Sequence, residues 1–98
     1  MGKRFTSEQL YHLRNHIPIN ALICALMIPA KTSDGIFRFL CPLCNQGHTA
    51  TNPKTNLARC FDCQKNFNPI DLVMILRKTG FVDSVKTLFI FDTTGKIP

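Results

Sequence analysis

The chain has 98 residues, enough for one small domain with a modest core and too few for a separate catalytic lobe. Hydrophobic residues make up 45% of the chain and charged residues 18%, which is ordinary for a globular protein. The net charge of +6, from 12 lysine and arginine against 6 aspartate and glutamate residues, favours an acidic partner, nucleic acid before an anionic membrane.

Two helices are predicted over residues 6–28. Thr6 and Gln9 have the spacing of a capping box, which starts a helix by satisfying two free backbone N–H groups. The second helix follows Pro18, and its apolar residues recur at helical spacing: Ile19, Leu22, Ile23, Leu26 and Met27. Cys24 lies among them, and we expect it to be a small buried hydrophobic residue. The helix should stop before Pro29, and KTSDG (31–35) has the composition of a turn.

Strands are predicted next, within residues 35–67, and two more helices over residues 69–90. GIFRFLC (35–41) alternates in the manner of a strand, and LARCF (57–61) predicts a second strand. Asn68, Pro69 and Asp71 form a helix start, and this helix should end at Gly80. VDSVKTLF (82–89) predicts a shorter last helix, and DTTGKIP (92–98) a frayed tail.

Two Cys-x-x-Cys pairs, Cys41–Cys44 and Cys60–Cys63, are separated by fifteen residues. This matches the spacing of zinc sites, in which two tight turns bring four thiolates to one centre about 2.3 Å from the metal. Structural zinc supplies on the order of 10–16 kcal/mol of apparent binding free energy, which would decide whether so small a domain folds. The expected fold class is therefore α+β. We expect one domain over residues 1–98, a small zinc ribbon whose short antiparallel sheet carries two cysteine knuckles and is flanked by helices.

Other uses of these side chains stay open. The thiols can form disulfides, act as a redox pair, or hold iron instead of zinc, although two matched pairs in a strand-rich frame favour zinc. His48, four residues after Cys44, can replace a misplaced thiol. His12 and His16 share one helix face at a spacing that can bind metal, but with no third ligand nearby a solvated face is favoured.

A site filled by four thiolates has no open position for water or substrate, as catalytic zinc requires. The sequence contains no nucleophile elbow, Walker loop, Gly-rich dinucleotide loop or HExxH motif. We therefore expect the chain not to be an enzyme by itself.

The chain is expected to be cytoplasmic and to have no membrane partner. Its first residues, MGKRFTSEQL, show no apolar segment typical of a signal peptide. The most apolar run (17–30) is too short to span a bilayer and is interrupted by Asn20 and two prolines.

The order of these features resembles the zinc-binding (CHC2-type) domain of bacterial, phage and plasmid DNA primases. The resemblance covers residues 16–89 and rests on HIPINAL (16–22), CPLC (41–44), CFDC (60–63) and NPIDLVMILRKTGFVDSVKTL (68–88). It implies a module that binds single-stranded DNA template in replication priming, here without the polymerase core. Two departures matter: Cys44 stands where the family usually has His, and NQGHTATNP (45–53) replaces a basic Lys-Thr-Pro-Ser-Phe-like stretch whose contacts are not carried over.

Single strands are bound by cations along the backbone and by aromatic faces on which bases stack. Cations and phenylalanines are interleaved around the cysteine pairs, although at least two of Phe37, Phe39, Phe61 and Phe67 must be buried against the helices. The expected nucleic-acid-binding residues are Lys31, Arg38, His48, Lys54, Arg59, Lys65 and Phe61.

Two functions follow as hypotheses. The first is a single-stranded DNA-binding module that acts with a primase catalytic subunit, a helicase or a single-strand-binding protein, for example on a mobile element. The second is a protein-interaction adaptor, for which residues 17–28 would leave an apolar patch exposed.

Overall fold

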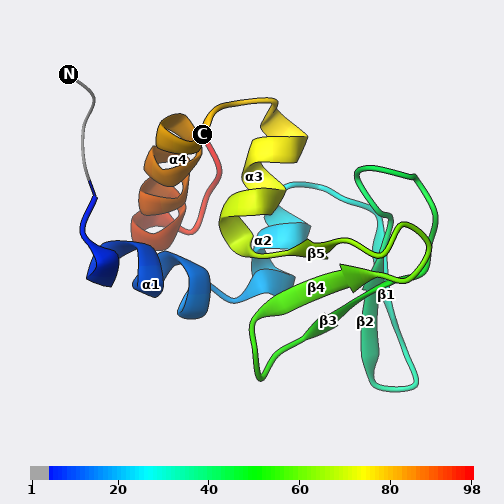
Figure 1. Ribbon diagram of the computed structural model, residues 1–98. Helices are drawn as coiled ribbons and strands as arrows, with labels where there is room; N and C mark the ends of the chain where they lie inside the picture. The colour runs from blue at the N-terminus through cyan, green and yellow to red at the C-terminus, as the bar shows by residue number, and fades with distance from the viewer. Residues whose placement is uncertain (1–4) are drawn as a thin grey trace.

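A five-stranded antiparallel sheet forms one end of the molecule, and helices from both ends of the chain form the other (Figure 1). The computed structural model describes residues 5–98. Its elements in chain order are α1 (Ser7–Asn15), α2 (Ile19–Ala25), β1 (Ala30–Ser33), β2 (Ile36–Phe39), β3 (Thr49–Asn52), β4 (Leu57–Cys60), β5 (Asn66–Phe67), α3 (Pro69–Arg77) and α4 (Phe81–Thr94). The predicted α+β fold class is confirmed.

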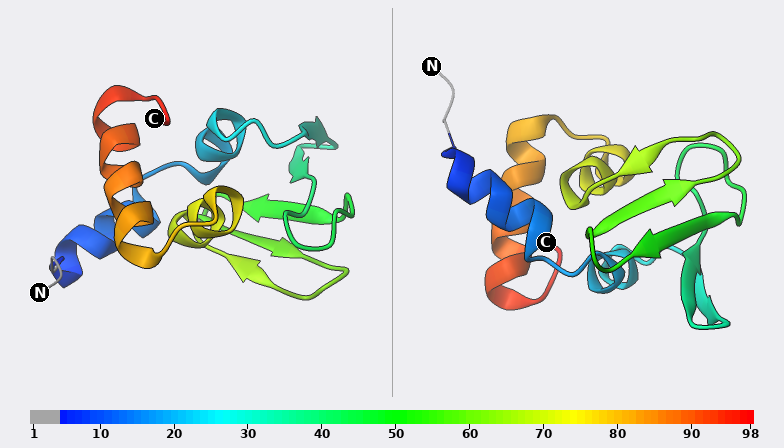
Figure 2. Two further views of the ribbon diagram at one scale, coloured as in Figure 1. Left: turned by 90° about the horizontal axis from the view of Figure 1, so that it is seen from above. Right: turned by 60° about the horizontal axis from the view of Figure 1, so that its bottom comes forward.

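The strands follow one another across the sheet in the order β1-β2-β3-β4-β5. The sheet is twisted, so the β1–β2 hairpin stands at an angle to β3, β4 and β5 (Figure 2). The prediction of a turn over residues 31–35, with the sheet starting at 35, was wrong, because Ala30–Ser33 pairs with Ile36–Phe39. Only Asp34 (φ 53°) and Gly35 (φ 77°) form the turn. Such left-handed pairs match the twist of two-residue hairpins.

Both predicted helix starts are confirmed. At α1 the N–H of Gln9 donates to Thr6 Oγ1 over 3.0 Å, and the N–H of Thr6 donates to Gln9 Oε1 over 2.9 Å. At α3 the same reciprocal pair joins Asn68 and Asp71, with Pro69 in the first helical turn. These side chains satisfy backbone donors that the helices leave free.

The expectation that Cys24 is buried was wrong, since the residue is exposed. Helix α2 is only 7 residues long, and its buried face consists of Ile19, Leu22 and Ile23. Each residue turns an α-helix by about 100°. The rotation from Ile23 to the next residue therefore places the Cys24 side chain outside the buried face.

The C-terminal helices differ from the predictions at their ends. Helix α3 stops at Arg77 rather than at Gly80, and Lys78 follows it in a left-handed conformation (φ 54°). Helix α4 runs to Thr94, past the expected end at residue 90 and into the tail expected to be frayed. Phe91 on this extension is buried, which anchors the added turn. Within residues 5–98, none of the helices combines the length and apolar character needed to cross a bilayer.

The core lies between the helices and one face of the sheet. Every helix contributes to it, through residues that include Leu13 (α1), Leu22 (α2), Leu72 (α3) and Leu88 (α4). The sheet contributes Phe39 and Phe67, which are 2% and 1% exposed. The prediction that at least two of the four phenylalanines near the cysteines are buried is confirmed. Residues that alternate with these along the strands project from the opposite face of the sheet.

Candidate metal centre and cationic sheet face

Two similar turns hold the four cysteines of the ribbon. Cys41 follows β2, Cys60 ends β4, and each begins a Cys-x-x-Cys turn. The N–H of Cys41 donates to the carbonyl of Gln46 over 3.0 Å, and the N–H of Cys60 donates to the carbonyl of Lys65 over 2.9 Å. The residue after the second cysteine of each turn is left-handed, with φ of 60° at Asn45 and 58° at Gln64. The two knuckles therefore share one backbone design.

The four sulfurs fit a single metal ion. All lie within 4.8 Å of one another, with Sγ–Sγ distances of 3.8 Å for Cys41–Cys63 and 3.5 Å for Cys44–Cys60. A tetrahedron with metal–sulfur bonds of about 2.3 Å has sulfur–sulfur edges of about 3.8 Å. The four cysteines named from their spacing are thus brought together at the separation that a tetrahedral ion requires, and they can hold one metal ion.

Backbone donors support the cluster from within. The N–H of Leu43 donates to Cys41 Sγ and the N–H of Cys63 donates to Cys60 Sγ, both over 3.4 Å. Cys41 and Cys60 are buried, whereas Cys44 and Cys63 are half-buried. Such donors stabilise negative charge on sulfur. All five cysteines are free thiols, so no disulfide competes with this arrangement in the described residues.

In the metal-free form the thiols differ sharply in acidity. Burial raises the pKa of Cys60, but the N–H of Cys63, the hydroxyl of Thr49 and two neighbouring thiols outweigh burial and lower that pKa to about 6. The N–H of Gln46 lowers the pKa of Cys44, but burial and the three other thiols raise it to about 12. Burial, with the neighbouring thiols of Cys60 and Cys41, also raises the pKa of Cys63. At neutral pH the cluster therefore carries the Cys60 thiolate and keeps protons on Cys44 and Cys63.

Metal affinity is consequently expected to rise with pH. A metal ion must displace the protons of Cys44 and Cys63, and each displaced proton changes the affinity about tenfold per pH unit. Two displaced protons over the two pH units between 6.5 and 8.5 should raise the zinc affinity about 10,000-fold. Below pH 6 the dependence should steepen, because Cys60 is then protonated as well. Competition with a chromophoric chelator of known pH dependence measures this, and a flat profile over that range would contradict the assignment.

Thr49 is a neighbour of the site that the sequence did not reveal. It pairs with Cys60 across the β3–β4 ladder and is fully buried. Its hydroxyl has no conventional hydrogen-bond partner, and it lowers the pKa of the Cys60 thiol, as a weak donor to sulfur does. The pairing depends on strand register, which no local motif around Thr49 encodes.

His48 lies beside the second knuckle but outside the cysteine cluster. Its Nδ1 is 2.7 Å from Asp62 Oδ2, and its backbone carbonyl accepts from the N–H of Phe61 over 3.1 Å. The group of side chains within metal-binding distance contains the four cysteines and no histidine. These two contacts connect His48, the residue before β3, to the second knuckle. They were not predicted from the sequence.

One row of side chains crosses all five strands on the face opposite the core. The ladder pairs Lys31 with Arg38, Arg38 with Ala50, Ala50 with Arg59, and Arg59 with Asn66. Directly paired residues of antiparallel strands project from the same face. No strand residue is acidic, and among residues 5–98 no lysine or arginine forms an ion pair with an aspartate or glutamate side chain. We call these five residues the cationic row.

The remaining candidates lie around the cationic row. Phe61 directly follows β4 and is 60% exposed. It lines two hollows, one shared with Arg38 and the other with Arg59. Lys54 and Lys65 are exposed on the turns before and after β4. Three of the seven predicted nucleic-acid contacts therefore belong to the row and Phe61 adjoins it, whereas Lys54 and Lys65 flank β4 and His48 pairs with Asp62.

Comparisons with known proteins identify no family for this chain, so its function is argued from the residues described above. No model of a protein family matches the chain, and no curated protein matches its sequence.

Proposed function

We propose that this chain is a zinc-binding module that binds single-stranded DNA across the exposed face of its sheet. The observation that carries the proposal is the cationic row. Its three cations share one surface, and no acidic residue lies on any strand. A strand of nucleic acid is a polyanion, so its phosphates supply the neutralising charge that the protein lacks here.

The geometry of the face suits a single strand. Neighbouring strands of a sheet lie about 4.8 Å apart, so Arg38 and Arg59, separated by one strand, are about 10 Å apart across the row. Ala50 between them is small and leaves the floor of the row open. Phe61 at its edge offers an exposed ring on which a base can stack. Cations that follow a backbone beside an aromatic face are the usual elements of single-strand recognition.

Zinc is the metal that we assign to the cysteine cluster. Four thiolates in a tetrahedron are the ligand set of structural zinc, and they leave no position for substrate. The ion would fix both knuckles and, through β2 and β4, the positions of Arg38 and Arg59. Its role is to hold the DNA-binding face, and the module has no catalysis of its own.

The biological setting that we propose is replication priming. It rests on the resemblance to primase zinc-binding domains over residues 16–89, including the pair of helices after the second knuckle. In that setting the chain would present template to a primase catalytic subunit, or act beside a helicase or single-strand-binding protein.

A protein-docking function is the second candidate, and one observation favours it. Met27 is 86% exposed and Leu43 is 49% exposed. A cleft of about 270 Å³ lies beside Met27, with apolar lining from Leu40, Pro42, Ile75 and Leu76. Contiguous exposed apolar surface of this kind marks interaction sites. Most large apolar residues of 17–28 are buried, however, so the patch is narrower than the sequence suggested.

The double substitution Arg38→Ala and Arg59→Ala tests the DNA-binding proposal. We expect it to weaken binding of a thymidine oligonucleotide at least tenfold at low salt, because two phosphate contacts are lost. For single strands the slope of log K against log[salt] should become less negative by about 1.4, at about 0.7 for each lost contact. Fluorescence anisotropy at several salt concentrations measures both quantities.

The matched control is Lys86→Ala with Lys96→Ala, which removes two positive charges from α4 and the residues after it. This variant should keep the wild-type salt slope. If wild-type protein binds no oligonucleotide, or if both double variants weaken binding equally, the cationic row is not a DNA-binding surface.

A further inference from the structure

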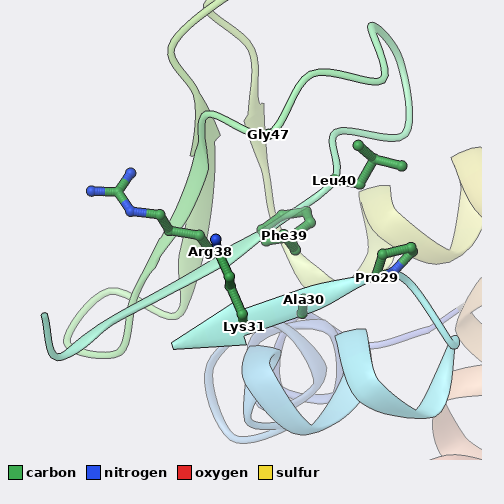
Figure 3. Close-up of a pocket in the computed structure, with 7 residues that line it drawn as sticks. All are labelled: Pro29, Ala30, Lys31, Arg38, Phe39, Leu40 and Gly47. Atoms are coloured by element: carbon green, nitrogen blue, oxygen red, sulfur yellow. The ribbon is translucent and has the colours of Figure 1, made fainter. Parts of the chain in front are cut away.

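A shallow, open cleft lies at the β1–β2 end of the cationic row (Figure 3). It has a volume of about 270 Å³ and lies between the hairpin and the loop after the first knuckle. The lining residues are Pro29, Ala30, Lys31, Arg38, Phe39, Leu40 and Gly47. Two of them, Lys31 and Arg38, also belong to the row, so the cleft and the row form one continuous surface.

The two sides of the cleft differ in chemistry. Figure 3 shows Pro29 and Leu40 on one side, Lys31 and Arg38 on the other, and the ring of Phe39 between them. Lys31 and Arg38 are the only lining residues with polar side chains. Their cross-strand pairing places two cations at one margin of an otherwise apolar cleft.

We propose that this cleft receives one base of the single-stranded DNA bound on the cationic row, an inference that rests on the proposed function. A base is flat and largely apolar on its faces, and it is joined to phosphates that Lys31 and Arg38 can hold. Pockets for drug-sized ligands span roughly 300–1,000 Å³, so a smaller cleft suits a single ring system rather than a whole nucleotide cofactor. Pro29, Ala30 and Leu40 provide apolar surface of the kind against which extruded bases pack, and the buried Phe39 lies beneath them.

Gly47 offers a way to block the cleft without disturbing the fold. A side chain added there meets no heavy atom within 4 Å at its Cβ, so Gly47→Leu should place its bulk in the open space at the cleft. Gly80, at the start of α4 and away from the cleft, is equally open. Gly80→Leu is therefore the matched control.

Two hexamers separate base recognition from phosphate recognition. One is a thymidine hexamer, and the other is an abasic hexamer with the same phosphates and no bases. We expect Gly47→Leu to weaken binding of the thymidine hexamer about fivefold or more, the lower end of what one stacked base contributes. It should leave the weaker binding of the abasic hexamer unchanged, and Gly80→Leu should change neither affinity.

An independent measurement uses the wild-type protein alone. In ¹⁵N-labelled protein, the thymidine hexamer should shift the amide resonances of Ala30, Phe39 and Gly47, whereas the abasic hexamer should shift only those of the row. If the thymidine hexamer binds and shifts the row but not the cleft, with Gly47→Leu unaffected, the base-binding cleft is refuted and the proposed function stands. If neither hexamer binds, both proposals fail.

Discussion

Replacing Cys60 with serine is expected to abolish stoichiometric metal binding and to unfold the protein. The apparent binding free energy of a structural zinc ion, on the order of 10–16 kcal/mol, is comparable to the roughly 5–15 kcal/mol total stability of a typical domain. Cys60 is buried, accepts from the N–H of Cys63 and lies 3.5 Å from Cys44, so serine cannot replace it without losing a ligand at the centre of the cluster. Treatment of the wild-type protein with a strong chelator should have the same effect.

Elemental analysis and circular dichroism during heating measure the two consequences. The matched control is Cys24→Ser, because Cys24 is a free thiol that is exposed and lies outside the cluster. This variant should keep one equivalent of metal and the wild-type melting temperature. A Cys60→Ser protein that retains its metal and its cooperative unfolding would show that the cluster does not hold the fold together.

The second large effect is expected at Asn56, in the turn between β3 and β4. Its Oδ1 accepts from the N–H of Ile19 over 2.9 Å, and its Nδ2 donates to the carbonyls of Arg14 and Ile17 over 2.8 and 2.6 Å. The residue is 7% exposed and left-handed, with φ of 57°. One side chain thus fastens the α1–α2 connection to the sheet.

Asn56→Ala should lower the free energy of unfolding by about 3 kcal/mol. The substitution leaves buried backbone groups without hydrogen-bond partners and places alanine in a left-handed conformation. The melting temperature should fall on the order of 15 °C. Asn56→Gly removes the same hydrogen bonds without the conformational penalty and should cost about 1 kcal/mol less. Urea unfolding of the zinc-loaded variants measures both, and a glycine variant as stable as wild type would show that these hydrogen bonds contribute nothing net.

The parts of the fold that local chemistry dictates could be predicted from the sequence. Capping boxes at Thr6 and Asn68 fixed two helix starts, because their hydrogen bonds involve residues three positions apart. The cysteine spacing predicted the cluster for a similar reason, since each knuckle is a local turn. Both predicted strands, within 35–41 and 57–61, also appear, as β2 and β4.

The parts that depend on distant partners could not be predicted. Strands β1 (AKTS) and β3 (TATN) are short and rich in polar residues, and they exist because neighbouring strands pair with them. The last turn of α4 depends on a burial site for Phe91 that tertiary packing creates. The hydrogen bonds of the Asn56 side chain join residues 37 or more positions apart, and nothing near Asn56 in the sequence identifies their partners.

The contacts of α1 with the C-terminal helices affect the order in which the parts of the protein can fold. Helix α1 contacts α3 and α4, and His12 Nε2 lies 3.0 Å from Asp92 Oδ2, 80 positions later. During translation α1 is made before α3 and α4, so it cannot make these contacts until both helices have been synthesised. All five strands and the four clustered cysteines are made before α3, so the thiols are available to a metal ion before α1 docks. Docking of α1 onto α3 and α4 would then be a late step of folding.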